Sequence, residues 1–202
     1  MRLYFSTTSP YARIARVALA EKGFADDIDG ALTDPWKDDQ GLLAANPSAR
    51  VPALVLDSGL PLSESLLIVL WLETRHPVPS LLGAAPERAI SRSGVAMGAI
   101  DAAASIIIGR RLDPAVDESP FGKRRRRSIV NAFERLEADP PVLSGDAADL
   151  AVIATVVLVD YIRFRFAGAP WLPAIPRLDA LASQARGRTS FSSTMPRDMP
   201  AT

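Results

Sequence analysis

Residues 1–23, MRLYFSTTSPYARIARVALAEKG, decide the fold of the first part of this chain. The run RLYF at 2–5 has the apolar and aromatic composition of a short strand. Ser9 and Pro10 then mark the beginning of a helix, because serine is a favoured N-cap and proline a favoured first helical residue. Apolar residues recur at helical spacing from there to Gly23, a residue typical of the position just after a helix. The stretch therefore predicts a strand followed by an amphipathic helix.

Strand and helix signals continue to alternate beyond this stretch. DIDGAL at 27–32 has the composition of a weak strand, and PALVLDSGLPL at 52–62 that of two strands, because its middle residues Asp-Ser-Gly favour a hairpin turn. SESLLIVLWLETR at 63–75 has an apolar stripe and predicts a helix with Ser63 as its N-cap. We expect residues 1–76 to form a small α/β domain.

A proline-rich break separates this part from the rest of the chain. Residues 77–86 contain three prolines and a glycine, a composition typical of a linker. Beyond it the strand signals stop, and we expect an all-helical domain over residues 87–202. Its predicted helices cover 87–111, 120–138, 147–166 and 174–187. In the third of them we expect Asp146 as the N-cap and Asp149 at the third helical position, because carboxylates stabilise the N-terminal end of a helix.

Composition argues against several classes of function. The 202 residues hold 23 Lys and Arg against 23 Asp and Glu, and this zero net charge argues against binding of nucleic acid. The basic run at 123–127 is flanked by acidic residues, so we expect a solvated helix face there. Without cysteine the chain has no thiolate nucleophile, no redox pair and no cysteine-based metal site, and we expect no metal. The single histidine, His76, stands where a helix should end, and we expect it to be structural.

We also expect a cytoplasmic protein that does not associate with a membrane. The N-terminus lacks the order of charged, apolar and small residues that defines a signal peptide. The longest apolar run, LAVIATVVLV at 150–159, lies between two aspartates and is too short to span a bilayer. We expect it to form a buried helix.

Four motifs follow one another along nearly the whole chain: SPYARIAR at 9–16, NPSARVPAL at 46–54, LSESLLIVLWLE at 62–73 and RGRTSFSSTMP at 186–196. In this order they resemble the motifs of the cytosolic glutathione transferases with a serine- or cysteine-type active site. Two residues depart from the pattern, since Arg50 stands where the family has lysine and Thr189 where it has proline. The overall pattern is similar to bacterial transferase-like proteins without an assigned substrate.

This resemblance implies a thioredoxin-like domain with the element order βαβ-αββα, followed by an all-helical domain. It also implies that glutathione is the co-substrate and that the Ser9 hydroxyl donates a hydrogen bond to its thiolate. The residues alone favour a simpler role for Ser9, that of a helix N-cap. Both roles require the side chain at the N-terminal end of the helix, where the dipole also favours a thiolate.

The resemblance further assigns the residues that hold glutathione. The Val51-Pro52 bond is expected to be cis, which exposes the backbone of Val51 to the cysteinyl backbone of glutathione. Arg50 would meet the glycine carboxylate. Glu64 would face the γ-glutamyl ammonium, and Ser65 with the free amides of its helix would bind the γ-glutamyl carboxylate. From the residues alone, Glu64 and Ser65 could equally form the ordinary first turn of a helix.

The second substrate is left open by the sequence. We expect a small electrophile or a peroxide in a pocket between the domains. Tyr11, Tyr161 and Phe164 are candidates to line that pocket because they are aromatic, and Asp101 is a candidate for a second acidic group at the glutathione site. We also expect a homodimer. The alternative is a non-catalytic module on the same fold that binds glutathione or a partner protein.

Overall fold

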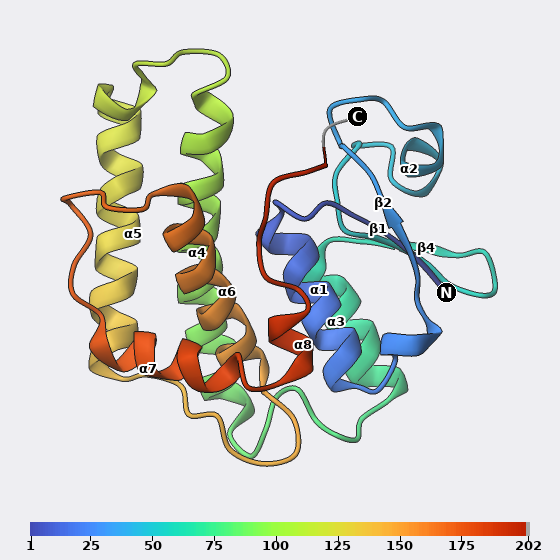
Figure 1. Ribbon diagram of the computed structural model, residues 1–202. Coiled ribbons are helices and arrows are strands. Elements are labelled where there is room, and N and C mark those ends of the chain that lie inside the picture. The colour runs from blue at the N-terminus through green and yellow to red at the C-terminus, as the bar shows by residue number, and fades with distance from the viewer. Residues whose placement is uncertain (201–202) are drawn as a thin grey trace. The chain divides into compact units, whose positions relative to one another are not determined.

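The computed structural model describes residues 1–200, which form two compact units (Figure 1). The first unit contains Met1–Leu81, the short segment Gly145–Ala148 and residues 188–200. The second contains Leu82–Ser144 and Asp149–Gly187. The C-terminal segment thus groups with the first unit, whereas it was expected in the helical domain. The reason is a set of hydrogen bonds from this segment to Arg13 and Glu21 of the first helix.

A four-stranded sheet forms the centre of the first unit. Its strands are β1 (Arg2–Phe5), β2 (Asp29–Leu32), β3 (Ala53–Val55) and β4 (Pro61–Ser63), in the order β2-β1-β3-β4. β1 runs parallel to β2 and antiparallel to β3, and β3 runs antiparallel to β4. The predicted strand at 2–5 and the predicted hairpin are confirmed, as is the strand within 27–32.

Helices cover both faces of this sheet. They are α1 (Pro10–Glu21), α2 (Gln40–Ala45) and α3 (Ser65–Arg75), and the short α8 (Thr189–Ser192) lies against α1. α1 packs against α3 and α8, while α2 contacts β3 and β4; Figure 1 shows α1 and α3 on one side of the sheet and α2 on the other. The fully buried side chains Leu3, Ile14, Leu54, Ile68 and Leu72 come from β1, α1, β3 and α3. Their burial stabilises the α/β unit, at about 1.5–3 kcal/mol per side chain.

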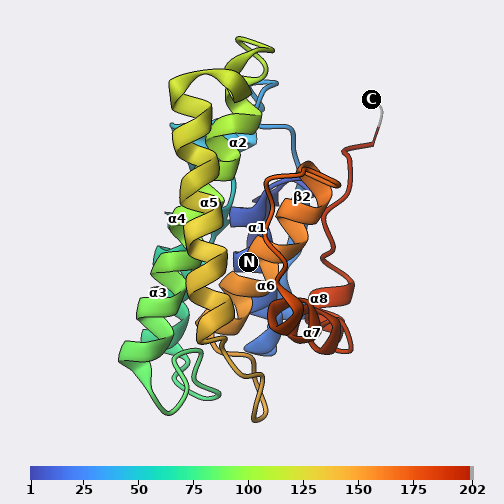
Figure 2. The ribbon, with the colours of Figure 1, turned by 90° about the vertical axis from the view of Figure 1, so that its left-hand side faces the viewer.

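The second unit is helical throughout its described residues. It consists of α4 (Pro86–Gly109), α5 (Pro120–Ala138), α6 (Leu150–Arg165) and α7 (Pro176–Ala185), with a 3-10 turn at Val116–Glu118. α4 packs against α5 and α6, and α6 against α7 (Figure 2). Residues 150–162 of α6 are all buried, which confirms the expected buried helix. The architecture is therefore a thioredoxin-like unit and an all-helical unit, as predicted.

Two predicted helix beginnings are wrong. α3 begins at Ser65 and not at Ser63, because Ser63 pairs with Ala53 as the last residue of β4. α6 is capped by Asp149 and not by Asp146, because the Asp149 carboxylate accepts the Val152 N–H at 2.8 Å.

The helix α4 has the length and composition of a membrane-spanning segment. About half of its most apolar stretch, 44%, is buried inside the protein. Core helices commonly meet the same criteria, so α4 carries no conclusion about a membrane.

Candidate active site

The first component of the candidate site is the N-terminal end of α1. Ser9 has extended backbone angles and its Oγ accepts the Ala12 N–H at 3.2 Å, while Pro10 is the first helical residue. Ser9 is therefore an N-cap, as the residues alone predicted. A serine hydroxyl has two acceptor lone pairs and one proton to donate, and capping uses only an acceptor. The Ser9 side chain is partly exposed, so its proton can still be donated to a bound molecule.

The second component is the turn before β3. The Val51-Pro52 peptide bond is cis, as expected from the resemblance. The side-chain amide of Asn46 donates to the Arg50 carbonyl at 2.8 Å, and this bond fixes the turn from inside the molecule. Asn46 was not predicted as a site residue, although its place at the start of the NPSARVPAL motif was a signal for it.

The third component is the beginning of α3. Glu64 has φ of 68°, in the left-handed region that non-glycine residues rarely occupy. Such conformations persist where the surrounding structure imposes them, and they are frequent at binding sites. No side chain caps this helix, so its first amides are available to an anion.

An ion pair connects the second and third components. Arg50 Nη1 and Glu64 Oε1 are 3.4 Å apart, and both side chains are about half exposed. A pair of this kind contributes at most about 1 kcal/mol to stability. Separating the two side chains therefore requires little free energy, and each could then bind an opposite charge on a ligand.

Sheet register brings the three components together. Tyr4 pairs with Ala53, and Ala53 pairs with Ser63. Because β1 and β3 are antiparallel, the loop that follows β1 toward Ser9 and the turn that precedes β3 lie at the same end of the strands. The residues that follow β4 lie at that end as well. Ser9, Arg50, Val51, Glu64 and Ser65 thus lie on three adjacent segments.

The other candidates divide between the units. Tyr11 is on α1, two residues after Ser9, whereas Asp101, Tyr161 and Phe164 belong to α4 and α6 of the second unit. Tyr161 is buried, and this burial raises the pKa of its hydroxyl against the opposing effect of Arg165. It offers little surface to a substrate. Within residues 1–200 no group of three His, Cys, Asp or Glu side chains could hold a metal ion.

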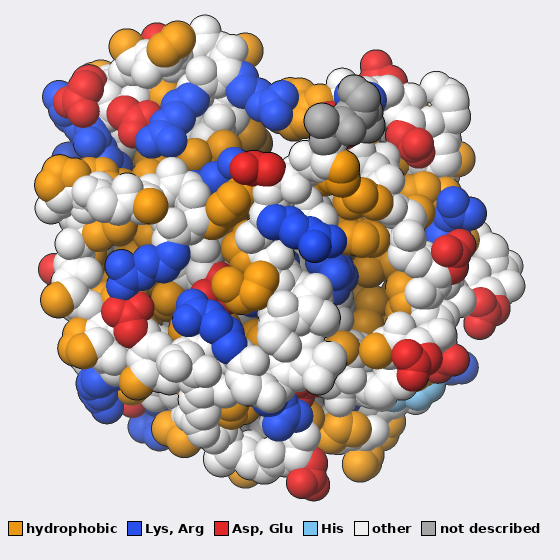
Figure 3. Space-filling model, in the orientation of Figure 1, with side chains coloured by type: hydrophobic (Ala, Val, Ile, Leu, Met, Phe, Trp, Pro, Cys, Tyr) orange, Lys and Arg blue, Asp and Glu red, His pale blue; other side chains and the backbone are white. Residues whose placement is uncertain are grey.

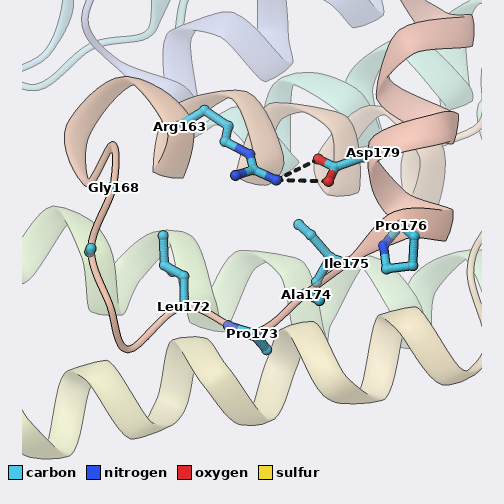
Figure 4. Close-up of a pocket in the computed structure, with 9 residues that line it drawn as sticks. Arg163, Gly168, Leu172, Pro173, Ala174, Ile175, Pro176 and Asp179 are labelled. Atoms are coloured by element: carbon cyan, nitrogen blue, oxygen red, sulfur yellow. Dashed lines mark hydrogen bonds and ion pairs between the residues drawn. The ribbon is translucent and has the colours of Figure 1, made fainter.

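A cavity of about 500 Å³ lies in the second unit, between the end of α6 and the beginning of α7 (Figure 4). Leu172, Pro173 and Ile175 line it on the connecting segment. On its wall Arg163 donates to both carboxylate oxygens of Asp179, at 2.8 and 2.7 Å. The pair neutralises the charge of this cavity, and none of the predicted site residues lines it.

Comparison with known proteins connects this geometry to one family. The family model described as "Glutathione S-transferase, N-terminal domain" matches residues 8–75. The uncharacterized GST-like protein YibF of Escherichia coli is 29% identical over 97% of this chain and 98% of its own length. Maleylacetoacetate isomerase of Pseudomonas aeruginosa is 30% identical over 98% of this chain and 96% of its own.

Solved structures give the same result. A glutathione S-transferase of Methylobacterium radiotolerans, in complex with glutathione sulfonate, superposes with a TM-score of 0.88 at 31% identity, over 100% of this chain and 97% of its own. A glutathione S-transferase of Methylobacillus flagellatus with bound glutathione has a TM-score of 0.85 at 28% identity, over 97% and 99% of the two chains.

Proposed function

Since the chain belongs to the glutathione S-transferase family, we propose that it is a glutathione transferase in which Ser9 activates the thiol of bound glutathione. The two similar bacterial proteins solved with glutathione or its sulfonate support glutathione as the co-substrate. The observation that carries the proposal is the Ser9 hydroxyl at the N-terminal end of α1, which accepts the Ala12 N–H and keeps its proton for a ligand.

The proposed role of Ser9 is to stabilise the thiolate form of glutathione. A hydrogen bond to a charged group contributes about 1.5–3 kcal/mol, which corresponds to about one to two pKa units. An ordinary thiol has a pKa of about 8.5, so this shift brings it near neutrality. The positive end of the α1 dipole acts in the same direction.

The remaining site residues would position glutathione against Ser9. Val51 would pair its backbone with that of the cysteinyl residue, as an added strand does at a sheet edge. Arg50 would exchange its partner Glu64 for the glycine carboxylate, while Glu64 would accept the γ-glutamyl ammonium. Ser65 and the first amides of α3 would bind the γ-glutamyl carboxylate.

The reaction uses a thiol that the protein does not itself contain. With no cysteine in the chain, the nucleophile is the sulfur of glutathione. The thiolate forms a bond from sulfur to the electrophilic carbon of the second substrate, and the leaving group departs with the electron pair of the broken bond. With a peroxide, the thiolate forms a bond from sulfur to one oxygen and the oxygen–oxygen bond breaks. The other oxygen leaves with that electron pair and takes up a proton from water, so sulfur is oxidised to a sulfenic acid as the peroxide is reduced to an alcohol or water.

Titration of bound glutathione tests the role of Ser9. The thiolate absorbance of bound glutathione is followed against pH for the wild type and for Ser9→Ala. We expect a pKa below about 8.5 in the wild type and a value about one to two units higher in the variant. The control is Ser119→Ala, because Ser119 caps α5 through the Gly122 N–H at 3.1 Å and also precedes a proline, as Ser9 does. It should leave the pKa unchanged.

The result also decides between the two functions. Saturable binding of glutathione with the same thiol pKa in the wild type and in Ser9→Ala would contradict activation by Ser9. It would instead support the alternative of a non-catalytic glutathione-binding module.

We also propose that the chain forms a homodimer through α3. Leu66, Leu67 and Leu70 on this helix are 39%, 57% and 58% exposed and form an apolar strip. Exposed leucines adjacent on one helix mark an interaction surface. Light scattering should give a dimer mass for the wild type and a monomer mass for Leu67→Lys. The matched substitution Leu112→Lys, at an 87% exposed leucine of the second unit, should leave the dimer intact.

A further inference from the structure

A second cavity lies entirely within the first unit. Its volume is about 210 Å³, and it is formed by α1, β1, the beginning of β2 and the C-terminal segment. Leu3, Phe5, Leu19 and Ile28 give it apolar walls. In Figure 3, Lys and Arg side chains gather over the C-terminal segment beside a hollow with an apolar floor, between that segment and β2. We call this cavity of about 210 Å³ the Arg16 cavity, after the charged residue that lines it.

Arg16 is an uncompensated cation. Its guanidinium carbon lies 4.5 Å from the centre of the Phe5 ring, and among residues 1–200 it has no carboxylate partner. Burial lowers the pKa of Arg16 to about 10, and the nearby charges of Arg13 and Arg197 contribute to this shift. The charge of Arg16 thus stands beside an apolar cavity, close to two other arginines.

The Phe5 ring contacts the Arg16 guanidinium beside the cavity. A guanidinium carries several N–H groups in one plane, and these can bind both oxygens of a carboxylate. The hydroxyls of Ser193 and Thr194, which also line the cavity, already donate to the carbonyls of Thr189 and Ser190, at 2.7 and 2.8 Å. Arg16 therefore supplies the charge-assisted donors, and the other walls supply apolar contact.

We propose that the Arg16 cavity binds a small organic monoanion, a carboxylate on a flat apolar body. The carboxylate would bind the guanidinium edge, and the apolar body would contact Leu3, Leu19 and Ile28. Glutathione does not fit this description, because it carries charged groups at both ends and has little apolar surface.

This site is separate from the one proposed for glutathione. Arg16 lies seven residues after Ser9 on the same helix, about 10 Å along its axis. None of Ser9, Arg50, Val51, Glu64 and Ser65 lines the cavity. The C-terminal segment forms one wall, and it is held to α1 by Arg13, which donates to the Phe191 carbonyl at 3.4 Å and to the Thr194 hydroxyl at 3.3 Å. A bound anion should therefore protect this segment from amide hydrogen exchange.

Binding of 2-naphthoate tests the proposal. Calorimetry with the full chain should show one saturable site, and the neutral analogue 2-naphthylmethanol should bind at least about tenfold more weakly. Arg16→Met should weaken naphthoate binding by a similar factor, because it removes the charge and keeps an apolar stem. Ala20→Phe should also weaken binding, since Ala20 lines the cavity and a larger side chain fills it.

A matched control is available on β1. Arg2 stacks on the Tyr4 ring at 5.5 Å but is exposed and paired with Asp29, so Arg2→Met should leave naphthoate binding unchanged. Saturating glutathione should not displace naphthoate, because the two sites are separate.

Several results would overturn the proposal. They are the absence of saturable naphthoate binding at millimolar concentration, equal affinity for the alcohol, unchanged affinity in Ala20→Phe, or competitive displacement by glutathione. Thermal unfolding of each variant shows whether it is folded. If Arg16→Met does not fold, the alcohol and Ala20→Phe decide the question, because neither removes a charge from the protein.

Discussion

The two ends of α1 differ in how completely their polar groups are used. At the C-terminal end, Lys22 has a fully buried side chain that binds Glu73 at 2.5 Å and donates to the carbonyls of His76 and Pro79. At the N-terminal end, Ser9 is partly exposed and makes one capping contact that leaves its proton to donate. One end of the helix is thus anchored in the first unit, and the other keeps a hydroxyl proton that its capping contact does not use.

Glu21 extends the anchored end to the C-terminal segment. Its side chain is 2% exposed, and its two carboxylate oxygens accept from Arg188 at 3.0 and 2.7 Å. The Ser190 hydroxyl and the Ala148 amide donate to the same carboxylate. Residues 167 positions apart in sequence are joined in this way. These bonds fix the C-terminal end of α1 to the C-terminal segment.

The largest expected effect is at Lys22. Lys22→Met removes the partner of Glu73 and the donor to two carbonyls, in a place that water does not reach. Breaking a buried ion pair in this way costs about 3–5 kcal/mol of unfolding free energy. Denaturant unfolding followed by tryptophan fluorescence measures it, since Trp71 lies 5.9 Å from the His76 ring at this end of the unit.

Lys123 provides the control for this prediction. Its side chain is 54% exposed and lies 3.6 Å from Glu118, so Lys123→Met should change stability by less than about 1 kcal/mol. Equal effects of the two substitutions would show that the anchor at Lys22 does not stabilise the unit.

The sequence predicted one end of α1 better than the other. Ser9 was identified as an N-cap because the signal, a serine followed by a proline and a helical apolar pattern, is local. Glu21 and Lys22 had the appearance of ordinary charged residues near a helix end, since their partners lie far away in the sequence. The same limit explains the wrong cap predicted for α6. Asp146 and Asp149 both lie within four residues of its first residue, and the local sequence does not decide which of them caps the helix. The sheet was predictable for the opposite reason, since alternation and turn residues are local.

Acid should weaken the Glu21 anchor. Burial alone would raise the pKa of Glu21, but the hydrogen bonds from Arg188, Ser190 and Ala148 outweigh it and lower that pKa below the ordinary value. A carboxylate with a lowered pKa in the folded state contributes stability that is fully present above about pH 4.3 and is lost as the pH falls through the folded value. Glu21→Gln should remove this pH dependence and cost about 1.5–3 kcal/mol at pH 7, the contribution of hydrogen bonds to a charged group.

Amide hydrogen exchange of residues 188–194 reports this loss directly, because the anchor holds that segment to α1. The segment should lose protection as the pH falls from about 4.3 through the lowered pKa of Glu21 in the wild type, and it should lack this protection at all pH values in Glu21→Gln. Glu134→Gln, at an exposed glutamate of α5, should behave as the wild type. Unchanged protection in Glu21→Gln would mean that other contacts, among them those of Arg13 and the bond from Arg188 to the Asp146 carbonyl, hold the segment without Glu21.

The smallest effect is at the N-terminal end of α1, and there a ligand separates the two roles of Ser9. Ser9→Ala and Ser119→Ala each remove an N-cap in front of a proline, so each should cost about 1 kcal/mol in the free protein. Saturating glutathione stabilises any variant that binds it in proportion to its affinity. Wild type and Ser119→Ala should therefore gain the same increase in melting temperature, while Ser9→Ala gains less above the thiol pKa, because its thiolate lacks a donor. Equal gains in all three proteins would mean that Ser9 only caps the helix and donates no hydrogen bond to bound glutathione.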